Sequence, residues 1–149
     1  MSTRGINNNN PLNIRIVTNQ SWLGEKKPNT DFSFVQFQSI EYGLRAGLLL
    51  LLNYKYKYGK DTISKIIQTF APSNENDTNG YINFVSNRAK IDKNKVLELS
   101  EYKAVIKAMI YQENSYEYSN YDQLFSKAIS LLPSYYKVLF SEKKKRLRV

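Results

Sequence analysis

Apolar residues recur at helical spacing in five segments of the chain. Side chains three and four positions apart share one face of a helix, so this spacing predicts amphipathic helices. The predicted helices cover residues 40–57, 61–70, 81–89, 100–113 and 121–132. The first is apolar nearly all round in its middle, which predicts that it is the central and most buried element.

Two segments near the start of the chain favour strands. Residues 13–17 ("NIRIV") and 32–37 ("FSFVQF") are rich in β-forming residues, and turn formers fill the stretch between them. This pattern predicts a hairpin or a small three-stranded antiparallel sheet. Strands followed by helices indicate an α+β fold, mainly helical, with about five helices. We expect one domain over residues 1–142 and a basic C-terminal tail over 143–149.

The predicted helix over residues 100–113 carries an apolar stripe that ends in a carboxylate. The stripe consists of Tyr102, Val105, Ile106, Met109 and Ile110, and Glu113 follows on the same face. An apolar environment and the negative end of a helix dipole both disfavour a charged carboxylate. A carboxyl group in such a place suits proton donation near neutral pH. The alternative is a glutamate that reaches solvent or pairs with a lysine.

The composition limits the catalytic groups, cofactors and partners that the protein can use. The chain has no cysteine and no histidine, which excludes thiolate and imidazole catalysis and the commonest metal ligands. Glycine-rich phosphate-binding loops and metal-ligand spacing are also missing from the sequence, so we expect no metal and no nucleotide cofactor. The net charge of +9 fits four kinds of partner: nucleic acid, anionic lipid, the bacterial envelope or an acidic protein. Nucleic acid rests on charge alone and is not the expected partner.

The sequence gives no sign of membrane insertion or export. The N-terminus lacks the apolar stretch of a secretory signal. The longest apolar run, residues 46–52, is far shorter than the roughly 20 residues that a membrane-spanning helix needs. We therefore expect neither a signal peptide nor a transmembrane segment.

The loop before the helix at 81–89 is the first candidate binding segment. It contains Glu75, Asn76, Asp77 and Thr78. Capping of the next helix by Asp77 or Thr78 explains one or two of these residues but does not require the others. Tyr81 then begins the helix and faces either a groove or the core.

The asparagine-rich N-terminus is the second candidate. Asparagine is common in turns because its side chain bonds nearby backbone, so this segment can be a turn that leads into the first strand. Alternatively, the amides of Asn10 and Asn13 line a polar groove suited to sugar hydroxyl and N-acetyl groups.

Five blocks of the sequence, in order, resemble a family of phage and prophage proteins usually labelled structural or virion proteins. The blocks are "RGINNNNPLNIR", "WLG", "FVQFQSIEYGLRA", "TISKIIQTFAPSNENDTNGYINFV" and "IKAMIYQEN". The resemblance runs from Arg4 to about Ser115. The chain departs from the family pattern at Asn7, Leu12, Phe70 and Ser115, where the family has Arg, Gly, Trp and Gly. None of these departures removes an acidic residue, but Ser115 in place of Gly makes the turn after the helix harder to form.

A second resemblance implies an activity. The segment from "NPLNIR" to "YINFV" is similar to the second half of a lysozyme-like glucosaminidase, in which the catalytic glutamate ends a helix that comes earlier. Here "AMIYQENS" looks like that helix, moved to the back by circular permutation, and nearby chain termini make such a permutation feasible. The resemblance implies a lysozyme-like domain in which the end of the Glu113 helix lies beside residues 7–14 and 73–81.

The same resemblance implies cleavage of the glycan strand of peptidoglycan, with Glu113 as the general acid. A lytic transglycosylase needs one acid, whereas hydrolysis would use Glu75 or Glu41 to assist water. The expected substrate-binding residues are Asn10, Asn13, Asn76, Thr78, Tyr81 and Asn114. The expected partners are peptidoglycan and other phage virion proteins, and the expected location is the virion, acting in the host envelope. Two alternatives stay open: a non-catalytic virion structural protein and a basic nucleic-acid-binding virion protein.

Overall fold

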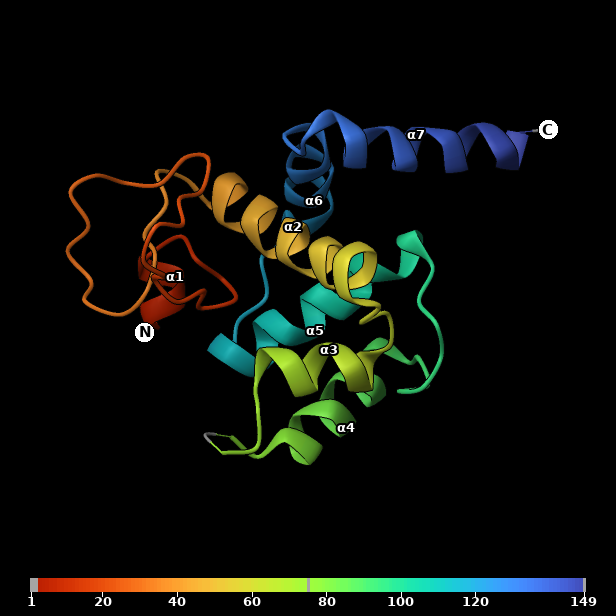
Figure 1. The fold of residues 1–149 in the computed structure, drawn as a ribbon, viewed down its shortest axis with the longest axis horizontal. Coiled ribbons are helices and arrows are strands. Elements are labelled where there is room, and N and C mark those ends of the chain that lie inside the picture. The colour runs from red at the N-terminus through yellow and green to blue at the C-terminus, as the bar shows by residue number, and fades with distance from the viewer. Residues whose placement is uncertain (1–2, 75, 149) are drawn as a thin grey trace. The chain divides into compact units, whose positions relative to one another are not determined.

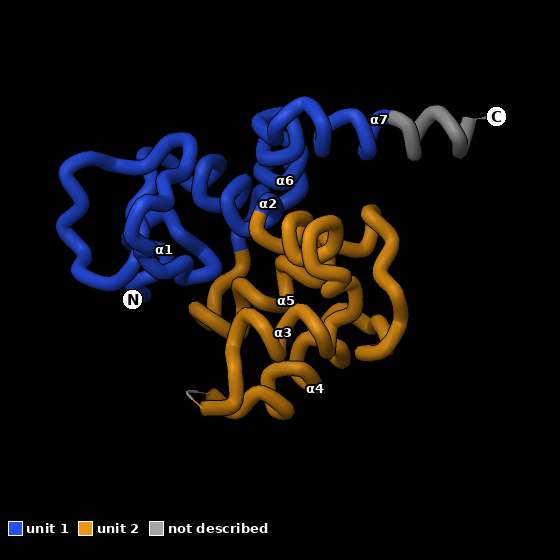
Figure 2. Tube along the Cα trace, viewed as in Figure 1, with its two compact units in different colours: residues 1–49, 118–149 blue, residues 50–117 orange. Residues whose placement is uncertain are grey.

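The structure is a computed structural model that describes residues 3–74 and 76–148, with side chains described as far as residue 141. The chain divides into two compact units (Figure 2). Unit 1 contains Met1–Leu49 and Tyr118–Val149, and unit 2 contains Leu50–Glu117. Compact units need not fold independently, so one domain over residues 1–142 stays a prediction.

Seven α-helices and one 3₁₀ helix form within the described residues (Figure 1). They are α1 (Arg4–Asn7), α2 (Ile40–Tyr58), α3 (Ile63–Phe70), α4 (Thr78–Ala89), η1 (Leu99–Glu101), α5 (Tyr102–Asn114), α6 (Tyr121–Ser130) and α7 (Ser134–Arg148). The five predicted helices are present as α2 to α6. Helices α1 and α7 were not predicted.

Helix α2 is deeply buried, as its apolar composition predicts. Leu44 and Leu48 in the part that belongs to unit 1 are 1% and 0% exposed. Leu51 and Leu52 in the part that belongs to unit 2 are both 0% exposed. The division between the units falls inside this helix.

The predicted antiparallel sheet is wrong, and with it the α+β fold class. Within the described residues the structure has no β-strand, only two isolated antiparallel bridges, Arg15 with Phe34 and Glu25 with Phe37. Segments 13–17 and 32–37 do meet, since the Ile16 N–H donates to the Ser33 carbonyl at 2.9 Å. The described part of the fold is helical with irregular loops.

Side chains replace the sheet because they take the backbone groups that a ladder needs. The Asp31 carboxylate accepts the N–H groups of Ser33 and Phe34, both at 2.9 Å. At the other end, the Asn10 side chain accepts the Ile14 N–H at 2.9 Å and donates to the Val35 carbonyl at 2.8 Å, the two groups that would bond each other in a ladder. Extended pairing between the two segments therefore stops after one bridge.

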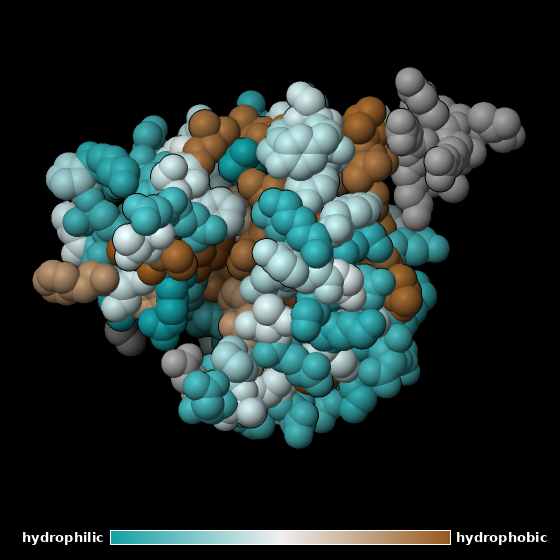
Figure 3. Space-filling view, viewed as in Figure 1, coloured by the Kyte–Doolittle hydropathy of each residue, from teal (hydrophilic) through white to brown (hydrophobic). Residues whose placement is uncertain are grey.

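In unit 2, α4 packs against both α3 and α5 (Figure 1). The stripe predicted for α5 is buried from Tyr102 to Ile110. Over α3 and α4, the face visible in Figure 3 is mostly hydrophilic. Unit 2 thus buries its apolar helix faces and leaves polar side chains outside.

Two helix starts differ from the prediction. Helix α3 begins at Ile63 rather than at residue 61, and its cap is Thr62, whose side chain accepts the Lys65 N–H at 3.1 Å. Helix α5 begins at Tyr102 rather than at residue 100, because Leu99–Glu101 form η1, whose start carries a capping box of Glu98 and Glu101. In both cases the α-helix begins two residues later than predicted.

The predicted basic tail over 143–149 lies outside the residues whose side chains are described, although α7 continues to Arg148. Across the described residues, no helix is both long and apolar enough to cross a membrane.

Candidate functional site

Helix α5 positions Glu113 at the end of its apolar stripe. Ile110, one turn earlier, is 2% exposed, whereas Glu113 is only half-buried. The helix ends directly afterwards, because Ser115 takes a left-handed backbone conformation with φ of 51°. Its N–H closes the last turn on the Tyr111 carbonyl at 2.7 Å. The backbone thus makes the turn that glycine would form more easily, and the carboxyl group stands where buried surface gives way to solvent.

Tyr81 holds the Glu113 carboxylate. Its hydroxyl donates a hydrogen bond to Glu113 Oε2 at 3.0 Å. The ring of Tyr81 is 6% exposed and meets Phe70 edge to face, with centroids 6.3 Å apart. Burial raises the pKa of Tyr81 well above its ordinary value, and the charge and hydrogen bond of Glu113 raise it further. The phenol therefore stays a hydrogen-bond donor at neutral pH.

Glu113 and Tyr81 open into a pocket of about 370 Å³, which we call the Glu113 pocket. It is lined by Asn76, Asp77, Gly80, Tyr81, Phe84, Gln112 and Glu113. Two carboxylates, two amides and one phenol therefore face the same space. Such a lining offers hydrogen bonds to a polar, hydroxylated ligand and a carboxyl group for proton transfer.

Asp77 has a structural task in this pocket as well. As the N-cap of α4, its side chain accepts the Gly80 N–H at 3.0 Å. A Cβ at Gly80 would lie 2.3 Å from Asp77 Oδ2, so any larger residue would displace the carboxylate. The missing side chain of Gly80 therefore lets Asp77 face the pocket.

One wall of the site is fixed by aromatic stacking between α4 and α5. Phe84 stacks on Tyr111, with centroids 6.1 Å apart and planes 14° apart. The Arg88 guanidinium lies 3.6 Å from the Tyr111 ring centroid and also pairs with Glu117 at 2.5 Å. The stacked rings and the Arg88 guanidinium above them hold the two helices that carry Tyr81 and Glu113 in register, whereas the exposed pair with Glu117 contributes little.

Comparison with known proteins supplies a relative from a phage. No protein-family model matches the chain. Over 125 residues the chain is 42% identical to Protein P5 of Pseudoalteromonas phage PM2, covering 83% of this chain and 78% of Protein P5. The chain belongs to the family of phage Protein P5. Membership in the P5 family confirms the resemblance to phage proteins at this coarser level, and it brings no activity with it.

Three of the residues predicted from the sequence lie together in this P5-family protein. Glu113, Tyr81 and Asn76 all line the Glu113 pocket, so residues of the loop at 73–81 lie beside Glu113, while the permutation itself stays a prediction. The Asn76 side chain also donates to the Pro72 carbonyl at 3.2 Å. Glu75 lies outside the described residues.

Two other predicted residues near the pocket serve the backbone. The Thr78 hydroxyl is buried and donates to the Ala71 carbonyl at 2.5 Å, which closes the loop before α4. Asn114 is 4% exposed, and its side chain donates to the Ile110 carbonyl at 3.2 Å within α5. Neither residue lines the Glu113 pocket, although Thr78 lines a second pocket of about 530 Å³ that also includes Asn76 and Asp77.

The predicted N-terminal residues belong to unit 1. Asn10 is 0% exposed, and its amide bonds the Ile14 and Val35 backbone. Asn13 adopts a left-handed φ of 53° and continues the turn with its N–H on the Asn10 carbonyl. Glu41 lies in the first turn of α2. That residues 7–14 lie beside Glu113 stays a prediction.

Asp77 was predicted as a member of the candidate binding loop or as a cap, and it is both the N-cap of α4 and a pocket residue. Gly80, Phe84 and Gln112 were not predicted to line the pocket, although Gly80 precedes Tyr81, Phe84 lies one helical turn after it and Gln112 precedes Glu113. Within the described part of the chain, no group of three Asp or Glu residues is arranged to hold a metal ion.

Proposed function

We propose that this P5-family protein is a phage protein that cleaves the glycan strand of peptidoglycan, with Glu113 as general acid and base. The observation that carries the proposal is the half-buried Glu113 carboxylate, held by the Tyr81 hydroxyl in an open polar pocket. A positioned carboxyl group of this kind is what glycosidic bond cleavage needs. The resemblance of the sequence to lysozyme-like glucosaminidases supplies the substrate class.

The proposed reaction is a lytic transglycosylation. Glu113 gives its proton to the glycosidic oxygen as the bond from that oxygen to the sugar C1 breaks. The resulting carboxylate then takes the proton of the same sugar's 6-hydroxyl, whose oxygen bonds to C1 and closes an anhydro ring. Glu113 ends the cycle protonated and no water is consumed, so one carboxyl group is enough. Asp77, the other described carboxylate of the pocket, is the candidate to assist water if the reaction is hydrolysis.

The role proposed for Tyr81 is positioning. Its hydroxyl fixes one oxygen of the Glu113 carboxylate, and burial keeps that hydroxyl protonated. Tyr81→Phe should therefore lower kcat and alter its pH dependence while leaving KM nearly unchanged. A purely structural residue would instead lower the amount of folded protein without changing the pH profile.

The test is clearance of isolated peptidoglycan by the purified protein. Glu113→Gln keeps the size and much of the hydrogen bonding of the side chain but cannot transfer a proton, so the rate should fall by roughly 10²- to 10⁴-fold. Glu117→Gln is the matched control, since it removes an exposed carboxylate that pairs with Arg88. Exposed ion pairs contribute little, so the control should keep its rate.

A second candidate function follows from the phage relative alone. If the wild-type protein clears no peptidoglycan, or if Glu113→Gln clears it undiminished, the proposal fails. The protein would then be a non-catalytic structural component of a phage, as membership in the P5 family also allows.

A further inference from the structure

Two more hollows adjoin the Glu113 pocket in unit 2. The middle pocket, of about 530 Å³, shares Asn76 and Asp77 with the Glu113 pocket. The Lys93 pocket, of about 350 Å³, shares Gln68 and Asn79 with the middle pocket. Each hollow thus shares two lining residues with the next, and we call the three together the amide groove.

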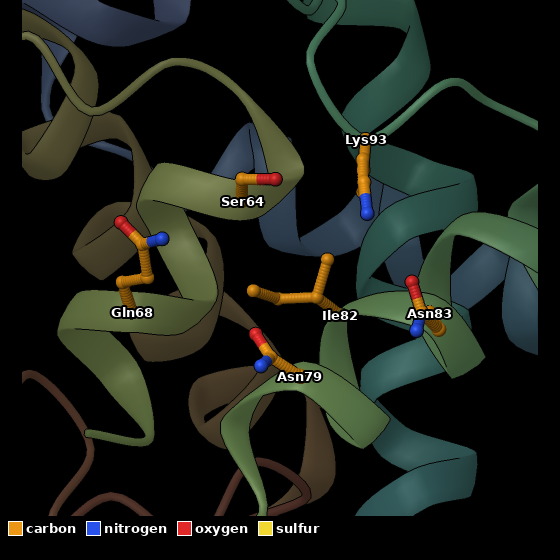
Figure 4. Close-up of a pocket in the computed structure, with 6 residues that line it drawn as sticks. All are labelled: Ser64, Gln68, Asn79, Ile82, Asn83 and Lys93. Atoms are coloured by element: carbon orange, nitrogen blue, oxygen red, sulfur yellow. The ribbon is translucent and has the colours of Figure 1, made fainter. Parts of the chain in front are cut away.

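The Lys93 pocket is built for a polar ligand with an acidic group. In Figure 4 the polar side chains of Gln68, Asn79 and Asn83 surround Ile82. The Lys93 ammonium points toward the same space. The Lys93 ammonium forms no ion pair with any carboxylate in the described part of the chain. An ammonium beside several amides is suited to bind a carboxylate and its neighbouring hydroxyl and amide groups.

The backbone at Lys93 is fixed. The Ser64 N–H, at the start of α3, donates to the Lys93 carbonyl at 3.0 Å. The Ser64 hydroxyl also bonds Asn94 Oδ1 at 3.2 Å. These bonds tie the loop after α4 to α3, so the position from which the Lys93 side chain reaches into the pocket is set before any ligand binds.

The two ends of the amide groove carry opposite charge. Lys93 lines one end, and the carboxylates of Asp77 and Glu113 line the other. A uniform polyanion such as nucleic acid would meet repulsion at the carboxylate end. The groove instead fits a chain that is neutral at one position and anionic at another, with hydroxyl and amide groups throughout.

We propose that the amide groove binds a glycan strand from which the peptides have been removed, with a free lactyl carboxylate of the strand at Lys93. This inference rests on the proposed function, because it takes the reacting end of the strand to lie at Glu113. It adds a preference for peptide-free over peptide-bearing strands, since the attached peptide converts the lactyl carboxylate into a neutral amide.

The test measures binding with cleavage switched off. The Glu113→Gln protein is titrated calorimetrically with three probes: a peptide-free tetrasaccharide of alternating N-acetylglucosamine and N-acetylmuramic acid, neutral tetra-N-acetylchitotetraose, and a single-stranded DNA octamer. The acidic tetrasaccharide should bind about 10-fold more tightly than the neutral one, and DNA should bind most weakly. A tenfold ratio is what one modest charge-assisted contact supplies.

Three variants, each added to Glu113→Gln, locate the effect. Lys93→Gln should remove the preference for the acidic tetrasaccharide. Lys57→Gln, an exposed lysine in the last turn of α2, should leave it intact. Asn79→Asp places a carboxylate in the groove at the start of α4, where an acidic residue favours the helix, so it should weaken acidic binding without unfolding the protein.

Equal affinity for the acidic and neutral sugars, or a preference that survives Lys93→Gln, would overturn the inference. Tighter binding of DNA that depends on Lys93 would also overturn it and assign the groove to nucleic acid. If the sugar preference holds but the wild-type protein cleaves nothing, the groove stands and the proposed reaction fails. If cleavage occurs without the preference, only the groove proposal fails.

Discussion

The loops of unit 1 and the helices of unit 2 are held together by different forces. In unit 1, the segment before α2 is organised by polar side chains that bond the backbone and one another. The Asp31 carboxylate accepts both the Arg4 guanidinium, at 2.6 and 2.7 Å, and the Asn8 amide, at 3.0 Å. The hydrogen bond from Arg4 holds the pKa of Asp31 far below its ordinary value. Unit 2 instead buries continuous apolar helix faces, such as the stripe of α5.

This difference decides where a substitution does most damage. When a buried polar group loses its partner, its full desolvation cost remains and lowers the free energy of unfolding. The loss of an apolar contact lowers that free energy only in proportion to the apolar area removed. Unit 1 should therefore be sensitive to the loss of single amides, and unit 2 should tolerate the loss of a single polar atom. Trp22, the one tryptophan of the chain, lies in unit 1 and reports its unfolding by fluorescence, while far-UV circular dichroism follows the helices.

The largest effect on stability is expected from Asn10→Ala. This change removes bonds from the Asn10 amide to the Ile14 and Val35 carbonyls and from the Ile14 N–H to the Asn10 carbonyl. The Ile14 N–H and the Val35 carbonyl lose this partner, while the Ile14 carbonyl keeps the Val35 N–H at 3.0 Å, so the free energy of unfolding should fall by about 3 kcal/mol. Urea unfolding followed by Trp22 fluorescence measures the loss.

Asn7→Ala is the control for Asn10→Ala, because Asn7 belongs to the same asparagine run but is exposed. It should change the free energy of unfolding by less than about 0.5 kcal/mol. Equal effects of the two changes would show that the buried amide does not organise unit 1.

The next effect is a contrast between two glycines of α2. A Cβ at Gly43 would lie 1.7 Å from the Asn9 carbonyl oxygen, which is backbone, so the loop would have to move. A Cβ at Gly47 would lie 2.8 Å from Leu12 Cδ1, the end of a side chain that can turn. Both alanines gain similar helix propensity, roughly 1 kcal/mol. Gly43→Ala should nevertheless lose about 1 to 3 kcal/mol of unfolding free energy, and Gly47→Ala clearly less. The reverse order in thermal unfolding would refute this packing of the loop on α2.

The smallest effect concerns a buried hydroxyl of unit 2. Tyr102 is 0% exposed, and its hydroxyl has no hydrogen-bond partner among the described residues. Burial and the nearby charge of Asp61 raise the pKa of Tyr102 above its ordinary value. Tyr102→Phe should leave the free energy of unfolding unchanged or raise it by up to about 1 kcal/mol. Tyr81→Phe, which loses the bond to Glu113, should lower it by about 1 kcal/mol instead. Chemical denaturation followed by circular dichroism compares the two, and a large loss for Tyr102→Phe would contradict this account.

The same difference explains which elements could be predicted from the sequence. Helices α2 to α6 could be predicted because the apolar residues of their buried faces recur at the helical period. The loops of unit 1 carry β-forming residues, yet Asp31 and Asn10 take the backbone groups that strands would share. Whether a side chain or a neighbouring strand bonds a given backbone group depends on tertiary geometry. Local composition therefore could not show that the strands would not form. Helix α7 was missed because its sequence after Tyr136 is dominated by charge rather than by an apolar stripe.

Helical periodicity also made part of the candidate site predictable. Glu113 and Tyr81 lie on helices whose periodicity is visible, so their faces could be inferred. The role of Asn10 could not be predicted, because an asparagine that bonds the backbone and one that bonds a ligand look the same in sequence. The amide groove was not foreseen, since it joins residues of α3, α4 and the loop at Lys93 that no single segment brings together.

The most direct test of the central claim is product analysis of isolated peptidoglycan digested by wild-type, Glu113→Gln and Glu117→Gln proteins. Soluble fragments are separated by liquid chromatography and identified by mass spectrometry. Wild-type and Glu117→Gln proteins should release glycan fragments ending in an anhydro ring, one water lighter than a hydrolysis product. Glu113→Gln should release them at no more than roughly one hundredth of that rate. Fragments released equally by Glu113→Gln, or no fragments from the wild-type protein, would contradict the claim that Glu113 is a catalytic acid.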